Sequence, residues 1–136
     1  MTRADVLRSW AGKWRNLHAW RRPLPAVVDV GKHRGERYVG LASPAECAAL
    51  ILDTGCLADG LKTALHELAH LAAPNRVAHG LAWARLYVAG AAEALGVEID
   101  PGMRPADLDR AVTRAADHWL TASGQRQFLR AIGVRV

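Results

Sequence analysis

The sequence has no long apolar run and only two cysteines. No stretch approaches the ~20 apolar residues that a helix needs to cross a bilayer, so no membrane span is expected. The N-terminal residues lack the apolar core and cleavage site of a secretory signal. Cys47 and Cys56 lie outside any CxxC pattern, which predicts neither a disulfide nor a second metal site. These absences favour a reduced, cytoplasmic protein.

Length and composition predict one domain. The chain has 136 residues, of which 51% are hydrophobic and 23% charged. Such a chain is large enough to bury a core without disulfides. No repeat or linker divides it, so we expect a single domain over residues 1–136.

Positive charge is concentrated near the N-terminus. Residues 1–37 hold nine Lys or Arg against three acidic residues, while the whole chain has a formal net charge of +5. Apolar residues at helical spacing, including Trp10 and Trp14, predict an amphipathic basic helix within residues 1–22 that ends before Pro23.

This basic segment has two interpretations. Arginines interleaved with Trp10, Trp14 and Trp20 have the composition of a surface that contacts nucleic acid by charge and stacking. The arginines concerned are Arg15, Arg21 and Arg22. Alternatively, the tryptophans lie in the core behind a solvated arginine face. The helical spacing favours the second interpretation, and nucleic-acid binding stays possible.

Short apolar segments in residues 26–55 predict a small sheet, antiparallel or mixed. The segments are residues 26–30, 37–41 and 48–52, separated by glycines and a Ser-Pro pair. Residues 44–50 would also fit a short helix.

A C-terminal helical region is expected over residues 104–136. Pro105 is a natural first residue of a helix and Gly124 a natural end. The predicted buried stripe comprises Leu108, Val112, Ala115 and Trp119. The tail, residues 125–136, fits a short helix or a strand.

The most specific pattern is HELAH, which begins at His66. Apolar residues recur at three and four over residues 59–73, which predicts a helix capped by Asp59 and ended by Pro74. His66 and His70 lie four apart on one face, away from the leucines, where two imidazoles reach one metal ion. Two purely structural histidines would be expected among the leucines or scattered in solvent.

A catalytic zinc site takes three protein ligands and one water. Glu67 follows the first ligand and can accept a proton from that water. His79 is the best candidate for the third ligand, because residues 75–78 can turn the chain into a second helix over residues 80–95. Glu93 on that helix is the alternative.

The HELAH motif, the short loop to His79-Gly80 and the run over residues 82–88 resemble the SprT-like branch of the zincin metallopeptidases. The resemblance covers residues 26–96. It implies an α+β fold in which a minimal zincin-like domain packs its sheet against the metal-site helices of residues 58–96. It also implies zinc at the three histidines, with Glu67 as general base. Leu81 replaces the usual proline, and the chain lacks the Cys-rich zinc ribbon of many DNA-directed members.

We therefore expect a zinc-dependent metallohydrolase, most simply a metallopeptidase, that acts on a peptide or protein substrate. In zincins the strand nearest the metal helix offers its edge to a peptide, and residues 51–54 are the segment expected there, or else a plain core strand. Candidate donors to the reacting oxygen are Tyr87, Arg85 and His118. His18 and His33 have no partner pattern and are expected at the surface. The alternatives are a nucleic-acid-associated SprT-like protease and a non-catalytic zinc-stabilised binding module.

Overall fold

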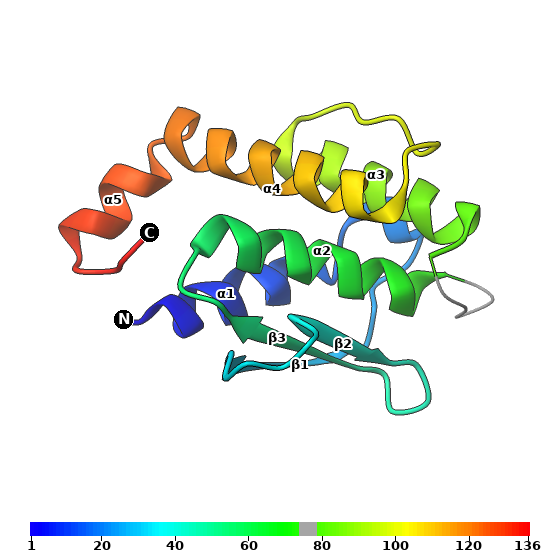
Figure 1. Ribbon diagram of the computed structural model, residues 1–136, viewed down its shortest axis with the longest axis horizontal. Helices are drawn as coiled ribbons and strands as arrows, with labels where there is room; N and C mark the ends of the chain where they lie inside the picture. The colour runs from blue at the N-terminus through cyan, green and yellow to red at the C-terminus, as the bar shows by residue number, and fades with distance from the viewer. Residues whose placement is uncertain (74–78) are drawn as a thin grey trace.

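The computed structural model describes residues 1–73 and 79–136, and within them it forms an α+β fold (Figure 1). In chain order the elements are α1 (Arg3–Trp14), the 3₁₀ turn η1 (His18–Trp20), β1 (Val27–Lys32), β2 (Gly40–Ser43), β3 (Ala48–Asp53), α2 (Leu57–Ala72), α3 (Leu81–Leu95), α4 (Pro105–Ala122) and α5 (Gln125–Ala131). The predicted helix end at Pro74 and the predicted turn over residues 75–78 lie outside the described residues. None of the described helices is both long and apolar enough to cross a membrane.

The three strands form a mixed sheet in the order β1-β3-β2. β1 runs parallel to β3, whereas β2 runs antiparallel to it, with Gly40 opposite Ile51. The prediction that residues 51–54 offer a free edge is therefore wrong, because β3 pairs on both sides. The apolar run of β3 suits a central strand, and β1 and the shorter β2 are the two edge strands. The alternative helix over residues 44–50 is also wrong, since a turn leads directly into β3.

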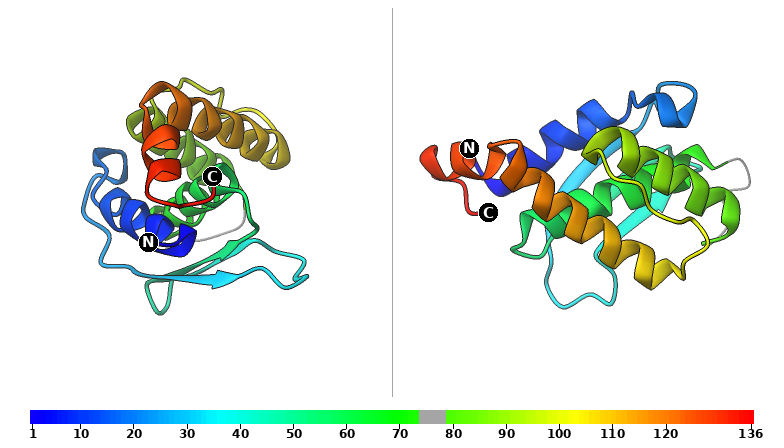
Figure 2. Two further views of the ribbon diagram at one scale, coloured as in Figure 1. Left: turned by 90° about the vertical axis from the view of Figure 1, so that its left-hand side faces the viewer. Right: turned by 90° about the horizontal axis from the view of Figure 1, so that it is seen from above.

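The elements are stacked in layers. The sheet lies on one side, α1 and α2 cover one of its faces, and α3 and α4 pack over the other side of α2 (Figures 1 and 2). α2 therefore contacts α1, α3, α4, β2 and β3. One hydrophobic cluster joins all five helices to the sheet, and most of α2 lies inside it.

The N-terminal helix is shorter than predicted. α1 ends at Trp14, not just before Pro23. The Trp20 indole donates a 2.7 Å hydrogen bond to the Trp14 carbonyl, which satisfies one of the carbonyl groups that a helix end leaves without an internal partner. The Arg15 guanidinium also turns inward and donates to the carbonyl of Ala26 at 2.9 Å.

The interpretation of the tryptophans as core residues is confirmed for Trp14 and Trp20, which are 4% and 3% exposed. Neither indole is available to stack on a base. Trp10 is half-buried and packs edge-on against Trp119, with ring centroids 4.9 Å apart. Binding of nucleic acid by the exposed arginines of this segment stays a prediction.

α2 begins earlier than predicted. Cys56 is its N-cap, and Asp59 lies within the first turn. The Asp59 carboxylate accepts a 3.0 Å hydrogen bond from the Thr54 hydroxyl and pairs with Lys62 at 3.2 Å. Asp59 therefore ties the helix start to the end of β3 and does not cap it.

The C-terminal region is helical, as predicted, and Leu108 and Val112 of the predicted stripe are buried, but the second half of the stripe is shifted by one residue. The core stripe of α4 comprises Leu108, Val112, Ala116 and Leu120, where the sequence predicted Ala115 and Trp119. These two are only half-buried, and the Trp119 ring packs against Trp10. Gly124 follows the helix with a φ of 75°, a conformation that glycine adopts without strain. The tail then forms α5, which is the helical alternative.

Candidate metal centre

The HELAH segment lies in the C-terminal half of α2. Leucines fill the core-facing sides of this helix, whereas His66 and His70 are half-buried and face a cavity. Glu67 lies between them and is only 6% exposed. The predicted separation of leucines from histidines is therefore present, although the polar side of the helix is also largely covered.

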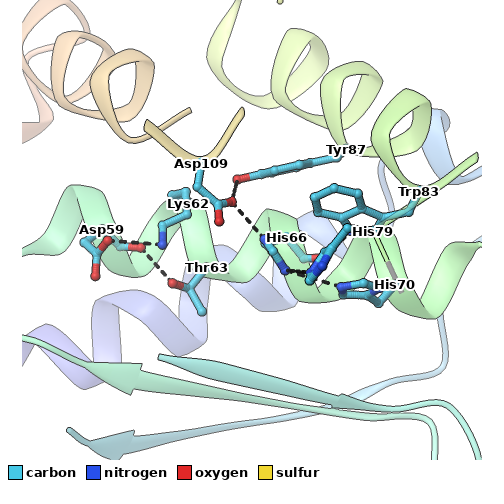
Figure 3. A network of polar contacts seen from close by, with 9 residues as sticks. All are labelled: Asp59, Lys62, Thr63, His66, His70, His79, Trp83, Tyr87 and Asp109. Atoms are coloured by element: carbon cyan, nitrogen blue, oxygen red, sulfur yellow. Dashed lines mark hydrogen bonds and ion pairs between the residues drawn. The ribbon is translucent and has the colours of Figure 1, made fainter. Parts of the chain in front are cut away.

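The structure brings the three predicted ligands together (Figure 3). The Nε2 atom of His66 lies 3.1 Å from Nε2 of His79 and 3.3 Å from Nε2 of His70. The three histidines form a group that could hold a metal ion. Tetrahedral zinc with Zn–N bonds of about 2.05 Å separates two ligand nitrogens by about 3.3 Å. The spacing of the imidazoles therefore fits such an ion.

Two of the three imidazoles, those of His70 and His79, are also in the protonation state that a metal ion requires. Burial, followed by the neighbouring His66 and His79, lowers the pKa of His70 to about 4. Burial and His66 likewise lower the pKa of His79. Both imidazoles are therefore neutral near pH 7, and a metal ion binds the neutral form.

His79 reaches the site from the start of α3. It directly precedes Gly80, the N-cap of that helix, so the rigid helix fixes where its backbone lies. The first turn of α3 also carries Trp83, which is buried. The Trp83 ring stacks on His70 with centroids 5.1 Å apart and lies edge-on to His79 at 4.6 Å. The indole thus forms a wall behind the imidazoles and limits their rotation.

Asp109 of α4 is a site residue that the sequence interpretation missed. Its Oδ1 atom accepts hydrogen bonds of 2.8 Å from His66 Nδ1 and from the Tyr87 hydroxyl. Because a carboxylate only accepts, Nδ1 of His66 carries a proton, and its Nε2 atom is the one that faces the other two histidines. Burial alone would raise the pKa of Asp109, but these hydrogen bonds bring it below its ordinary value.

The only signal for Asp109 in the sequence is indirect. A metal-binding histidine usually donates its second nitrogen to a carboxylate, but several acidic residues in the chain could have supplied one. Only the packing of α4 on α2 determines that Asp109 is the carboxylate that contacts His66.

Glu67 faces the sheet edge. Its carboxylate lies so close to Gly40 of β2 that a Cβ atom at position 40 would approach Glu67 Oε2 to 2.7 Å and Thr63 Cγ2 to 2.4 Å. Burial raises the pKa of Glu67 to about 7, with a further contribution from the charge of Asp109, against the opposing effect of His66 and Lys62. A carboxylate with that pKa can both accept and release a proton near neutral pH.

A cavity of about 570 Å³ opens over these groups. One wall is β2 with its flanking residues, and the other is α2 with Asp109 of α4. The lining residues are Arg37, Tyr38, Val39, Gly40, Leu41, Ala42, Pro44, Lys62, Thr63, His66, Glu67, His70, His79 and Asp109. The three histidines and Glu67 are therefore accessible to a bound molecule that also contacts the sheet edge.

Comparisons of the chain with protein-family models, with curated proteins and with solved structures give no match. The site therefore rests on the geometry of its own residues.

The remaining candidates lie apart from the cavity. The Glu93 carboxylate accepts hydrogen bonds of 2.9 Å from the backbone amides of His18 and Ala19, so it stabilises η1 and does not join the histidines. Arg85 and His118 are exposed and do not line the cavity. Tyr87 is fully buried, and its hydroxyl donates to Asp109.

His18 lies at the surface as expected, whereas His33 is more buried than expected and has a partner. His18 is exposed, and His33 is half-buried with a ring nitrogen 2.9 Å from the Glu36 carbonyl oxygen. Cys47 and Cys56 are both free thiols.

Proposed function

We propose that the protein is a zinc-dependent metallohydrolase of the zincin type that cleaves peptide or amide bonds. The observation that carries the proposal is the convergence of the Nε2 atoms of His66, His70 and His79 at 3.1 and 3.3 Å beside a buried glutamate. Three histidines with a fourth position left for water are the ligand set of a catalytic zinc site. The SprT-like resemblance of the sequence points to the same chemistry.

Zinc, when bound, lowers the pKa of a coordinated water towards ~7 and polarises a carbonyl group. The residues of the chain supply the remaining functions. His66 is held through Nδ1 by Asp109, and the ring of His70 is held against Trp83. The Glu67 carboxylate accepts the proton of the attacking water and later delivers it to the leaving amine.

The substrate would lie between α2 and the edge strand β2. Among the described residues β2 pairs with β3 alone, so its other edge can form backbone hydrogen bonds with an extended peptide. This assignment replaces residues 51–54 as the expected docking edge. Residues 37–42 line the same cavity as Glu67, which supports a peptide over a bulky folded substrate.

Metal content is the first test. Protein purified without added metal should carry about one zinc per chain, and His79→Ala should carry much less. His118→Ala is the matched control, because this histidine is exposed and lies away from the cavity. No zinc in the wild-type protein, even after zinc is added back, would overturn the proposal.

Activity is the second test. Glu67→Gln removes the proton acceptor but leaves the three ligands, so it should keep zinc while losing cleavage of fluorogenic peptides. If the wild-type protein holds zinc yet cleaves no peptide or amide, the site belongs to a non-catalytic binding module.

A further inference from the structure

Lys62 is a buried charge that the hydrolytic mechanism does not use. It lies one helical turn before His66 on α2, and its side chain is only 9% exposed. Its ammonium group pairs with Asp59 Oδ1 at 3.2 Å (Figure 3). Burial of a lysine costs free energy even when the charge is paired, and buried lysines are correspondingly rare. A pair with Asp59 alone could form equally well at the surface.

Lys62 and Asp109 form a wall that two cavities share. The metal cavity lies on one side of them. On the other side a second cavity of about 510 Å³ lies between the first half of α2 and α4, with Arg110, Thr113 and Arg114 among its lining residues. A second hollow therefore lies beyond Lys62, along the N-terminal half of α2.

The charged side chains that line the two cavities favour the binding of an anion. Three of the acidic side chains in the walls already have partners: Asp59 pairs with Lys62, Asp109 accepts from His66 and Tyr87, and Asp117 pairs with Arg126. In contrast, Arg37 and Arg114 form no ion pair within the part of the chain that the structure describes. In the metal cavity the cations Arg37 and Lys62 balance the carboxylates of Glu67 and Asp109. The charge of a divalent ion would therefore be left uncompensated.

We propose that Lys62 and Arg114 form an anion subsite and that the substrate carries a carboxylate on the side of the scissile bond that faces the N-terminal half of α2. This inference rests on the hydrolase function proposed above. Four residues along a helix correspond to a rise of about 6 Å, so the carboxylate lies about that far from the reacting carbonyl group. The lysine ammonium provides a compact charge with three donors, of which Asp59 uses one.

Two matched zinc-binding probes test the subsite by binding alone. One is a hydroxamate with a carboxylate four methylene groups away, and the other has a carboxamide in place of that carboxylate. Calorimetry with the zinc-loaded protein should give about tenfold tighter binding of the carboxylate probe, as expected for a charge-assisted hydrogen bond. Lys62→Met, which keeps the length of the apolar stem, should bind both probes equally.

Two further variants complete the experiment. Lys32→Met makes the same substitution at an exposed position of β1 and should keep the tenfold preference. Arg114→Gln changes an exposed residue, so it leaves the core intact and should reduce the preference even if Lys62→Met folds poorly. Equal binding of both probes to the wild-type protein, or an unchanged preference in Lys62→Met and Arg114→Gln, overturns the subsite. Failure of both probes to bind protein that holds zinc would instead reject the hydrolase function, and the subsite with it.

Discussion

His66 donates a hydrogen bond of 2.8 Å from Nδ1 to Oδ1 of Asp109, and this bond connects the histidine-bearing helix α2 to α4. The same oxygen accepts a 2.8 Å hydrogen bond from the Tyr87 hydroxyl of α3. One carboxylate oxygen therefore joins three helices directly behind the first predicted metal ligand. The orientation of that ligand is set before any ion binds.

Asp109→Asn should weaken zinc binding by about 10- to 100-fold, because the amide is a poorer acceptor for His66 and lacks the negative charge that makes the imidazole more basic. Competition with a chromogenic chelator measures this affinity. Asp117→Asn, on the exposed part of the same helix, is the control and should leave zinc binding unchanged. Wild-type affinity in Asp109→Asn would show that the contact does not orient the ligand.

Tyr87→Phe separates two roles for the tyrosine. Burial, with the adjacent Asp109, raises the pKa of the Tyr87 hydroxyl well above its ordinary value, so it stays protonated and donates to the carboxylate. Loss of this bond should lower the free energy of unfolding of the metal-free protein by about 1.5–3 kcal/mol, measured by urea denaturation. Zinc affinity should fall less than in Asp109→Asn. A large loss of kcat with unchanged stability would instead indicate direct stabilisation of the transition state.

The stability of the metal-free protein should depend on pH through Glu67. Its folded-state pKa is raised to about 7 from an ordinary value of 4.5. Between these two pH values the folded state binds more protons than the unfolded state, so the free energy of unfolding falls as the pH rises. Glu67→Gln lacks this dependence and should become the more stable protein by up to about 3 kcal/mol at pH 7 and above.

Urea denaturation of both proteins from pH 4.5 to 8, with a chelator present, checks this prediction. The low pKa of His70 acts in both proteins and therefore cancels in the comparison. Parallel stability profiles would contradict the burial of an ionised Glu67. Addition of zinc should weaken the dependence of the free energy of unfolding on pH, because a nearby cation favours the ionised form of the Glu67 carboxyl group.

Gly40→Ala should displace the Glu67 carboxylate, because the added methyl group would lie 2.7 Å from Oε2 and 2.4 Å from Thr63 Cγ2. Overpacking of this kind costs about 1–3 kcal/mol of stability. Zinc content should be retained while peptide hydrolysis falls, since the three histidines are not involved. Elemental analysis and a fluorogenic assay measure the two effects.

Gly12→Ala is the matched control for this substitution. Gly12 lies inside α1 with no atom within 4 Å of an added Cβ, so alanine should stabilise the helix by about 0.5–1 kcal/mol. Full hydrolytic activity in Gly40→Ala would show that the close approach of β2 does not position Glu67.

The local part of the site could be predicted from the sequence. Periodic leucines placed the HELAH motif on a helix, and the spacing to His79 selected the third member of the group. Both predictions depend on residues close together in the chain. The ends of the helices were less predictable, because Cys56 caps α2 without a side-chain hydrogen bond and the Trp20 indole satisfies the end of α1.

The non-local part could not be predicted in the same way. The segments that form β2 and β3 have similar compositions, and only the pairing of the strands makes β3 central and β2 an edge strand. Asp109 lies 43 residues from His66 in the sequence, and its role follows from how α4 crosses α2. Strand order and helix packing depend on which surfaces fit together, which is a property of the whole core.

The position of α2 at the centre of the fold has a consequence for local opening. This helix contacts three other helices and two strands, so the amides around His66 and His70 should exchange with solvent hydrogen only when the whole molecule unfolds. The edge strand β2 pairs on one side and should exchange through smaller openings. Two of the three histidines thus lie on the most protected segment, whereas the opposite wall of the cavity can open without disturbing them.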